Sequence, residues 1–185
     1  MNYRRLNITI RYFVLLAILG IAVQNSAVAK TFDNQNGPEL PGICSTIQVE
    51  EGNKLAFHVY ARGVQIYKWN GTSWVFEAPV ASLFAEPEFF GEVGTHYVGP
   101  RWESKSGSKV RAARVLETGC RPDPTAIEWL LLARVESSGP GIFEKVTFIQ
   151  RTNTKGGIAP TTPGTTVGEV AEVPYTAEYY FYRQQ

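Results

Sequence analysis

Hydrophobic and polar residues alternate with a period of two along much of the chain, most clearly in the stretch 142–160. Alternate residues of a β-strand point to opposite faces of a sheet, and β-branched and aromatic residues favour that setting. The pattern predicts a strand over about 143–151. Its faces carry Val146, Phe148 and Gln150 on one side and Lys145, Thr147, Ile149 and Arg151 on the other. The polar residues 152–157 end in two glycines, which predicts a turn or a ligand-facing loop.

Similar short β-rich runs recur along the chain, separated by glycine and proline. They cover residues 55–60, 64–69, 73–78, 80–85, 109–116, 129–132, 143–151, 169–173 and 177–182. The chain shows no sustained helical period and no internal repeat. The pattern therefore predicts an all-β, single-domain antiparallel β-sandwich or barrel of about nine or ten short strands, with both forms open.

Asn70-Gly71 separates two of these runs and predicts a hairpin. Asn-Gly can supply the two positive-φ positions of a type I′ turn, so strands 64–69 and 73–78 should pair antiparallel. Asn70-Gly71-Thr72 also matches the acceptor pattern for N-glycosylation. We favour the turn, because Trp69 and Trp74 beside it already explain a hairpin.

Two segments are harder to assign. Residues 94–103 mix glycine, proline, aromatic and ionisable residues densely, which predicts a shaped loop between strand ends. Asp123-Pro124 is typical of a helix start, yet residues 129–132 are apolar on all sides, as in a strand buried on both faces. We favour a short turn at Asp123 followed by a buried strand.

The first residues resemble a secretory signal peptide. Three arginines precede an apolar run at 12–23, and Ala27-Val28-Ala29 is a small-x-small cleavage pattern. We expect a signal peptide over 1–29 cleaved after Ala29, a loosely ordered leader over 30–42 and one β domain over 43–185. The apolar run is shorter than the ~20 residues that span a bilayer. We therefore expect an exported protein, periplasmic or secreted, with no stable membrane span after cleavage.

The composition and net charge of the chain limit the kinds of partner that it can bind. Removing 29 of the 185 residues leaves 156, enough for one domain. The leader holds three of the 18 basic residues and none of the 17 acidic ones, so the mature chain has 15 basic residues and a formal charge of −2. This balance, with both signs interspersed, argues against nucleic acid and against an anionic membrane surface.

Cys44 and Cys120 are the two cysteines of the mature chain. An exported protein meets an oxidising environment, so we expect a disulfide between them, with two buried free thiols as the alternative. No CxxC or CxxH pattern accompanies them, which argues against a cysteine metal site. His58, His96 and Glu103 would bind a metal only if folding brought them together, and we expect neither a metal nor a cofactor.

A series of motifs in order resembles the exported proteins grouped as domain of unknown function 3455. The motifs are Gly63-Val64-Gln65-Ile66-Tyr67, Trp74-Val75-Phe76, Ala78-Pro79, Gly94-Thr95-His96-Tyr97, Gly99-Pro100, Trp102-Glu103, Trp129-Leu130-Leu131-Leu132, Ile149-Gln150-Arg151, Asn153-Thr154, Gly156-Gly157 and Pro174-Tyr175-Thr176-Ala177. The resemblance spans roughly 44–182 and implies no assigned activity. Some members are named after malate dehydrogenase, but this chain has no GxGxxG motif and no βαβ alternation. Glu128 stands where the family pattern has proline. A proline at this position fits the entry to a strand better than the interior of a helix.

The candidate site residues come from the two polar segments and the last strand. They are His96, Tyr97, Trp102, Glu103, Arg151, Asn153 and Tyr175. A histidine near a carboxylate can act as an acid, a base or a ligand donor, and arginine binds carboxylates and phosphates. The bland alternatives are an internally paired Arg151 and an Asn153 that only caps a turn, while His58 has the setting of a packed strand residue.

Three functions are compatible with these residues. The first is a non-catalytic module that binds a small molecule, a glycan or a surface through aromatic side chains. The second is a hydrolase or lyase that uses His96 with Glu103 or Arg151. The third is a structural envelope or stress protein, expected if no pocket joins the two polar segments. We favour the first.

Overall fold

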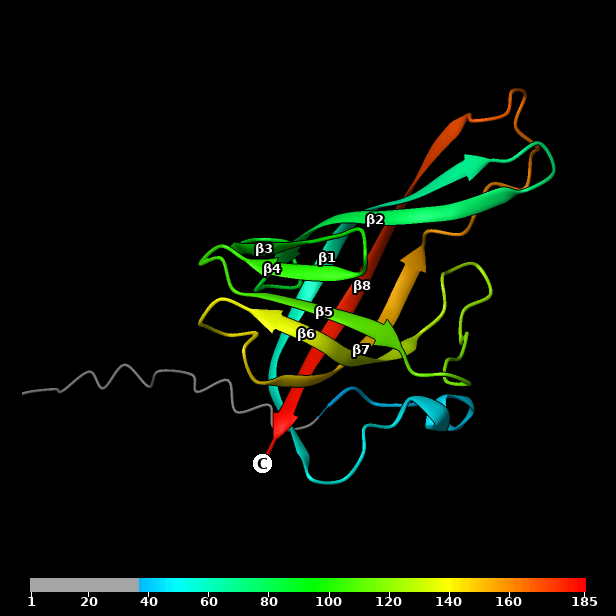
Figure 1. The fold of residues 1–185 in the computed structure, drawn as a ribbon. Helices are drawn as coiled ribbons and strands as arrows, with labels where there is room; N and C mark the ends of the chain where they lie inside the picture. Colours follow the sequence, from blue (N-terminus) through cyan, green and yellow to red (C-terminus); the bar gives the residue numbers. More distant parts are fainter. Residues whose placement is uncertain (1–36) are drawn as a thin grey trace, which may run out of the picture. The chain divides into compact units, whose positions relative to one another are not determined.

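The computed structural model describes residues 37–185, which form an antiparallel β-barrel preceded by a short 3₁₀ helix (Figure 1). The expected signal peptide, and the leader up to residue 36, lie outside the described residues. In order, the elements are η1 Gly42–Ile47, β1 Asn53–Trp69, β2 Trp74–Phe84, β3 Glu92–Tyr97, β4 Arg101–Ser104, β5 Lys109–Arg114, β6 Leu130–Ser138, β7 Val146–Gly156 and β8 Val170–Gln184. No helix within 37–185 is long and apolar enough to cross a membrane.

Each strand pairs with the next one along the chain, and β8 pairs with β1 to close the barrel. The predicted all-β fold is confirmed, and of the two forms left open the chain adopts the barrel. It has eight strands rather than nine or ten. Three pairs of predicted runs each form one strand, 55–60 with 64–69, 73–78 with 80–85 and 169–173 with 177–182, while β3 and β4 were not predicted. Gly63 does not break β1. It lies so close to the Val80 carbonyl of β2 that no Cβ would fit there.

The predicted loop at 94–103 is wrong, because most of it belongs to the hairpin of β3 and β4. Only Val98, Gly99 and Pro100 connect the two strands. His96 pairs with Trp102 across the hairpin. The glycine and proline of this segment shape a tight turn and leave the strand alternation on either side intact.

Strand β7 also differs from its prediction, since it begins at Val146 and continues to Gly156 instead of ending near Arg151. A register shift between Val146 and Phe148 reverses the alternation, so that Val146 and Ile149 both lie in the interior. A second shift follows Thr152, where Asn153 has φ 49°. This β-bulge lets the polar segment remain in the sheet, because Asn tolerates positive φ better than most residues.

The hairpin at Asn70 is confirmed, with Trp69 opposite Trp74. The type I′ turn is wrong, since Gly71 has φ 97° but Asn70 does not have positive φ. Instead, Asn70 Oδ1 accepts hydrogen bonds from the amides of Thr72 and Ser73, at 2.9 and 2.8 Å. The side chain of Asn70 therefore holds a four-residue loop.

The turn at Asp123 followed by a buried strand is confirmed. Asp123 Oδ1 accepts a hydrogen bond from the Thr125 amide at 2.7 Å, and β6 starts at Leu130. Leu131 and Leu132 point to opposite faces of β6, yet both are buried. Leu132 packs in the barrel interior, and Leu131 packs beneath the N-terminal segment that contains η1.

The N-terminal segment that contains η1 is fixed to the outside of the barrel by a second apolar cluster and a disulfide. Cys44 and Ile47 of η1 pack against Trp129 and Leu131, and Gln150 Nε2 donates to the Ile47 carbonyl at 2.7 Å. The expected disulfide between Cys44 and Cys120 is confirmed. It joins residues 76 positions apart.

Removing the disulfide should destabilise the barrel. A closed loop of 76 residues restricts the unfolded chain, and the usual effect of such a bond is about 2–4 kcal/mol. We expect Cys44→Ser/Cys120→Ser to lower the free energy of unfolding in urea by that amount. Reductant should have no effect on the double variant. An unchanged midpoint for fully reduced wild-type protein would contradict the expectation.

Candidate functional site

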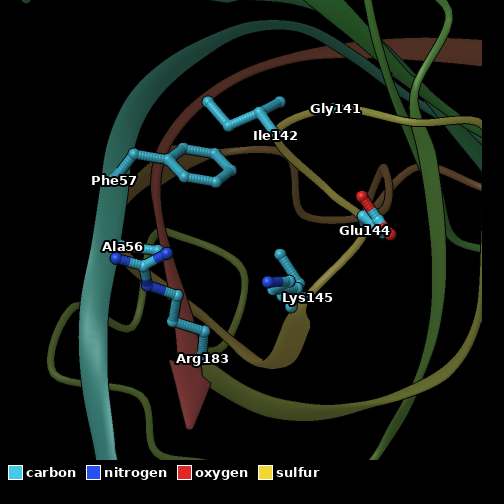
Figure 2. Close-up of a pocket in the computed structure, with 8 residues that line it drawn as sticks. Ala56, Phe57, Gly141, Ile142, Glu144, Lys145 and Arg183 are labelled. Carbon is cyan, nitrogen blue, oxygen red and sulfur yellow. The ribbon is translucent and has the colours of Figure 1, made fainter. Parts of the chain in front are cut away.

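Two hollows of the barrel differ in the residues that line them, and therefore in their suitability as a ligand site. One of about 320 Å³ lies between Phe57, Ile142, Glu144, Lys145 and Arg183 (Figure 2). Its charged side chains come from the turn before β7 and from the end of β8. None of its lining residues has a buried polar atom without a hydrogen-bond partner. It has the features of an ordinary surface hollow.

The second hollow is a cavity of about 570 Å³ that reaches the barrel interior. We call it the barrel cavity. Its lining combines core residues with residues of the β3–β4 turn and the end of β5. The residues are Gln65, Phe76, Glu77, Pro79, His96, Val98, Gly99, Pro100, Trp102, Arg111, Ala112, Ala113, Arg114, Leu130, Leu132, Arg151 and Tyr179.

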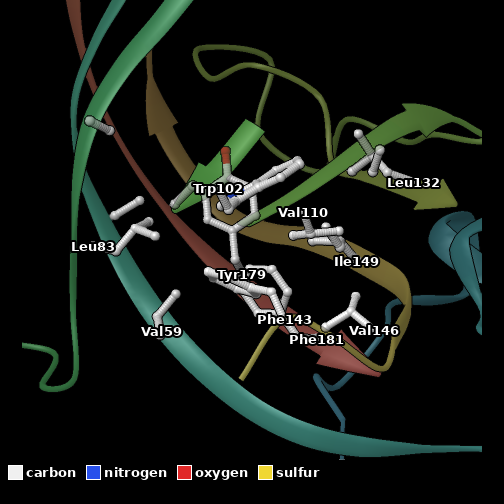
Figure 3. Packing of buried hydrophobic residues seen from close by; sticks show 14 of the residues in the cluster. Val59, Leu83, Trp102, Val110, Leu132, Phe143, Val146, Ile149, Tyr179 and Phe181 are labelled. Atoms are coloured by element: carbon white, nitrogen blue, oxygen red, sulfur yellow. The ribbon is translucent and has the colours of Figure 1, made fainter. Parts of the chain in front are cut away.

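Strand register explains why residues distant in sequence meet here. Cross-strand partners share a face of the sheet, so His96 and Trp102 on β3 and β4 point inward together. On the facing side, Arg151 of β7 is opposite Leu130 on one neighbour and Tyr179 on the other. The cavity therefore lies between a histidine–tryptophan pair and an arginine–tyrosine pair (Figure 3 shows Trp102 and Tyr179).

His96 is buried and electrically neutral. Its Nδ1 lies 2.8 Å from the Arg101 carbonyl oxygen, so this nitrogen carries the hydrogen and Nε2 is left as an acceptor. The imidazole stacks on Trp102 with ring centroids 4.3 Å apart. Burial lowers the pKa of His96 to about 3, with a smaller lowering contribution from the charge of Arg151. At neutral pH the ring is a polar, uncharged wall of the cavity.

Three other lining residues carry buried polar atoms without a hydrogen-bond partner of ordinary length and geometry among the described residues. They are Gln65 Nε2, Trp102 Nε1 and the Tyr179 hydroxyl. The Tyr175 hydroxyl, which lies close to Tyr179 and Gln65, also lacks a partner of ordinary length and geometry. Burial raises the pKa values of both tyrosines, so both keep their protons. Such groups are unusual in protein interiors and call for an explanation.

Arg151 supplies the positive charge of the inner cavity. Its Nε and Nη2 donate to the Glu128 carbonyl at 3.0 and 2.8 Å. The Glu128 carboxylate instead pairs with Arg114 at 3.0 Å. Within residues 37–185, no carboxylate lies within ion-pair distance of Arg151.

Of the seven candidate residues, the structure places His96, Trp102 and Arg151 in the lining of the barrel cavity. Tyr175 is buried next to them, 2% exposed. Asn153 lies elsewhere, in a groove shared with Tyr60 and Glu178.

Tyr97 and Glu103 lie on the outer face of the barrel. The Tyr97 hydroxyl donates to Glu103 Oε2 at 2.9 Å, and Lys109 Nζ lies 3.2 Å from the same oxygen. The hydrogen bond from Tyr97 is the main cause of the lowered pKa of Glu103. His96 and Glu103 therefore do not meet, because strand alternation sends them to opposite faces.

Sequence reasoning missed Gln65 and Tyr179 as lining residues. Gln65 lies between Gly63 and Tyr67 on the inward face of β1, where a polar residue is unexpected. A polar residue in phase with buried neighbours was the available signal. Tyr179 shares a face of β8 with Phe181, but Tyr180 and Tyr182 on the other face are aromatic too, so the sequence does not indicate which face is internal.

The described residues form no group of three or more histidine, cysteine, aspartate and glutamate side chains suited to a metal. His58 lies outside the barrel interior, with Nε2 3.0 Å from Glu178 and its ring stacked on Tyr180. The set His58, His96 and Glu103 is therefore not brought together.

Fold and cavity define the class of protein, a closed up-and-down β-barrel of eight antiparallel strands with an internal cavity. A family model described as "Protein of unknown function (DUF3455)" matches residues 50–183, so the chain belongs to that family. The resemblance carried by the motifs is confirmed. Comparisons with curated proteins and with solved structures gave no match.

The neutral state of His96 predicts a loss of stability in mild acid. The folded pKa is about 3 and the ordinary value 6.5, so between these pH values the unfolded chain binds a proton that the folded chain does not. Stability contributed by the neutral ring is present above pH 6.5 and declines as pH falls. The decline should reach about 2 kcal/mol at pH 5.

Urea unfolding of wild type and His96→Asn at pH 7 and pH 5 tests this. Asparagine can still donate to the Arg101 carbonyl, but it has no titrating ring. The pH-dependent loss should be smaller in the variant by about 2 kcal/mol. Equal losses in both proteins, or an NMR titration of the folded His96 ring above pH 5, would contradict the assignment.

Proposed function

We propose that this protein is an exported, non-catalytic barrel that binds a small molecule in the barrel cavity. The observation that carries the proposal is a cavity of about 570 Å³ that reaches the core of a closed eight-stranded barrel. Ligand pockets usually measure about 300–1,000 Å³ and are found in the mouths of β-barrels. Barrels of eight strands have room for one small ligand.

The walls of the cavity suit an amphiphilic ligand. Apolar side chains, among them Leu130, Leu132 and Ala112, offer surface that a hydrocarbon or aromatic group can cover. The Trp102 ring is held by its stack on His96 and by an edge contact with Tyr179, centroids 5.4 Å apart. A rigid wall of this kind limits the entropy that ligand binding would remove.

The arrangement supports binding more than the catalytic alternatives. His96 has a low pKa, and its Nδ1 is engaged by a backbone carbonyl. Glu103 lies on the outer face of the barrel, where it contacts Tyr97 and Lys109. A structural role without a site was expected only if no pocket joined the two polar segments, and the barrel cavity joins His96 to Arg151.

Export is supported by the basic and apolar leader pattern of the sequence and by the disulfide. If the full chain is expressed in a host with a secretory pathway, the recovered protein should begin at Lys30. Intact-mass measurement checks this, with an Ala27→Glu/Ala29→Glu variant as the uncleaved control. Full-length protein confined to the cytoplasm would contradict export.

Filling the cavity should abolish binding of an apolar probe. N-phenyl-1-naphthylamine, which is neutral and fluoresces in apolar surroundings, should bind the wild type saturably. Ala112 lines the cavity and is 1% exposed, so Ala112→Phe should place a ring in the cavity and weaken binding at least ~tenfold, or ~1.4 kcal/mol.

Ala133→Phe is the matched control. Ala133 lies on the neighbouring strand β6 and lines an outer groove, away from the barrel cavity. This variant should bind the probe like wild type, and circular dichroism should show both variants folded. Absence of saturable binding by wild type, or unchanged binding by folded Ala112→Phe, would overturn the proposed function.

A further inference from the structure

We infer that the ligand of the barrel cavity carries an anionic oxygen headgroup, a carboxylate or a similar oxyanion, which Arg151 binds together with Gln65, Trp102 and Tyr179. This inference rests on the proposed function and specifies the chemistry of that same site. The apolar part of the ligand would lie along Leu130, Leu132 and Ala112. Four observations support the assignment.

The first is the kind of polar atom left without a partner. Gln65 Nε2 and Trp102 Nε1 can only donate hydrogen bonds, and the protonated Tyr179 hydroxyl can donate one. These three residues are 2%, 1% and 1% exposed. Buried donors without acceptors are unfavourable, and a ligand with several acceptor oxygens would satisfy them.

The second is the state of Arg151. Nearby arginines pair with carboxylates: Arg111 Nε lies 2.8 Å from Glu136 and Arg114 Nη1 lies 3.0 Å from Glu128. The Arg151 guanidinium donates to a neutral carbonyl through Nε and Nη2, it has no carboxylate partner among the described residues, and the Tyr179 hydroxyl lies beside it. A guanidinium in this state can bind an oxyanion through a charge-assisted hydrogen bond.

The third is that the hydrogen-bond donors converge on the same cavity from different strands. The donors come from β1, β4, β7 and β8, and Arg151 and Tyr179 are cross-strand partners. The positive charge of Arg151 lowers the pKa values of His96, Tyr175 and Tyr179 against the larger effect of burial on the tyrosines. The guanidinium therefore lies close enough to influence the ionisation of the groups around the barrel cavity.

The fourth is that the other charged residues that line the barrel cavity do not neutralise the positive charge of Arg151. Arg111 and Arg114 are each paired with a glutamate. Glu77 is the one carboxylate among the residues that line the cavity, and its side chain is exposed on β2. His96 stays neutral. Arg151 is therefore the cation of the lining that has no carboxylate partner among the described residues.

Matched ligands with a common ten-carbon chain test the inference. Displacement of N-phenyl-1-naphthylamine gives the affinities of decanol, decanoate and decyl phosphate for wild-type protein. We expect at least one of the two anions to bind ~tenfold tighter than decanol, because a charge-assisted hydrogen bond is stronger than a neutral one. The two anions also distinguish a carboxylate site from a phosphate site.

Arg151→Gln should remove this preference and leave decanol binding within about twofold. Arg134→Gln is the control, since Arg134 is exposed on β6 and the substitution changes net charge equally. Equal affinity for decanol and both anions in wild type would overturn the headgroup inference and leave the proposed function standing. Failure of the probe and of all three ligands to bind would instead overturn the proposed function.

Tyr179→Phe provides a second variant that removes only a hydroxyl. Loss of an unpartnered hydroxyl should leave the melting temperature of the free protein unchanged or higher, and it should weaken anion binding more than decanol binding. Tyr67→Phe is the matched control: its hydroxyl donates to the Gly157 carbonyl at 2.7 Å, so this variant should melt lower. If Tyr179→Phe melts lower and keeps full anion affinity, the hydroxyl has a structural role and the inference fails for that residue.

Discussion

Closure of the sheet by pairing of β8 with β1 is the constraint on which the rest of the structure depends. The pairing runs from Asn53 opposite Gln184 to Lys68 opposite Val170, along nearly the full length of both strands. It leaves the barrel without free sheet edges and gives it an interior. Once that interior exists, strand alternation decides for every residue whether it faces the core or the outside.

The interior is filled in two different ways. One part is a conventional apolar core, in which Phe57 stacks on Phe181 with centroids 4.5 Å apart and Phe143 packs against both. The other part contains Arg151 and Gln65, which a core built only for stability would replace with apolar residues. Proteins that depart from their own packing rules commonly do so at functional sites. The position of these polar residues beside a cavity is consistent with that rule.

The fold class could be predicted from the sequence, because alternation, glycine and proline placement and the absence of a helical period are local signals. The site could be predicted only in part. His96 stands three residues before Gly99 and Trp102 two residues after Pro100, and the density of turn formers concealed that both occupy inward positions of a hairpin. Gln65 and Tyr179 required knowledge of which face of β1 and β8 lies inside, and only closure of the barrel determines that. Asn153 was separated from Arg151 by a bulge that the sequence did not signal.

The outer cluster also bears on the site, through a chain of backbone contacts. Cys120, tied to Cys44 by the disulfide, exchanges backbone hydrogen bonds with Trp129 at 2.8 and 3.1 Å. Trp129 follows Glu128, whose carbonyl accepts both hydrogen bonds from Arg151. The segment fixed by the disulfide therefore also orients the guanidinium in the cavity. Since a charged group binds an anion well only when its position is set in advance, the disulfide would contribute to affinity as well as to stability.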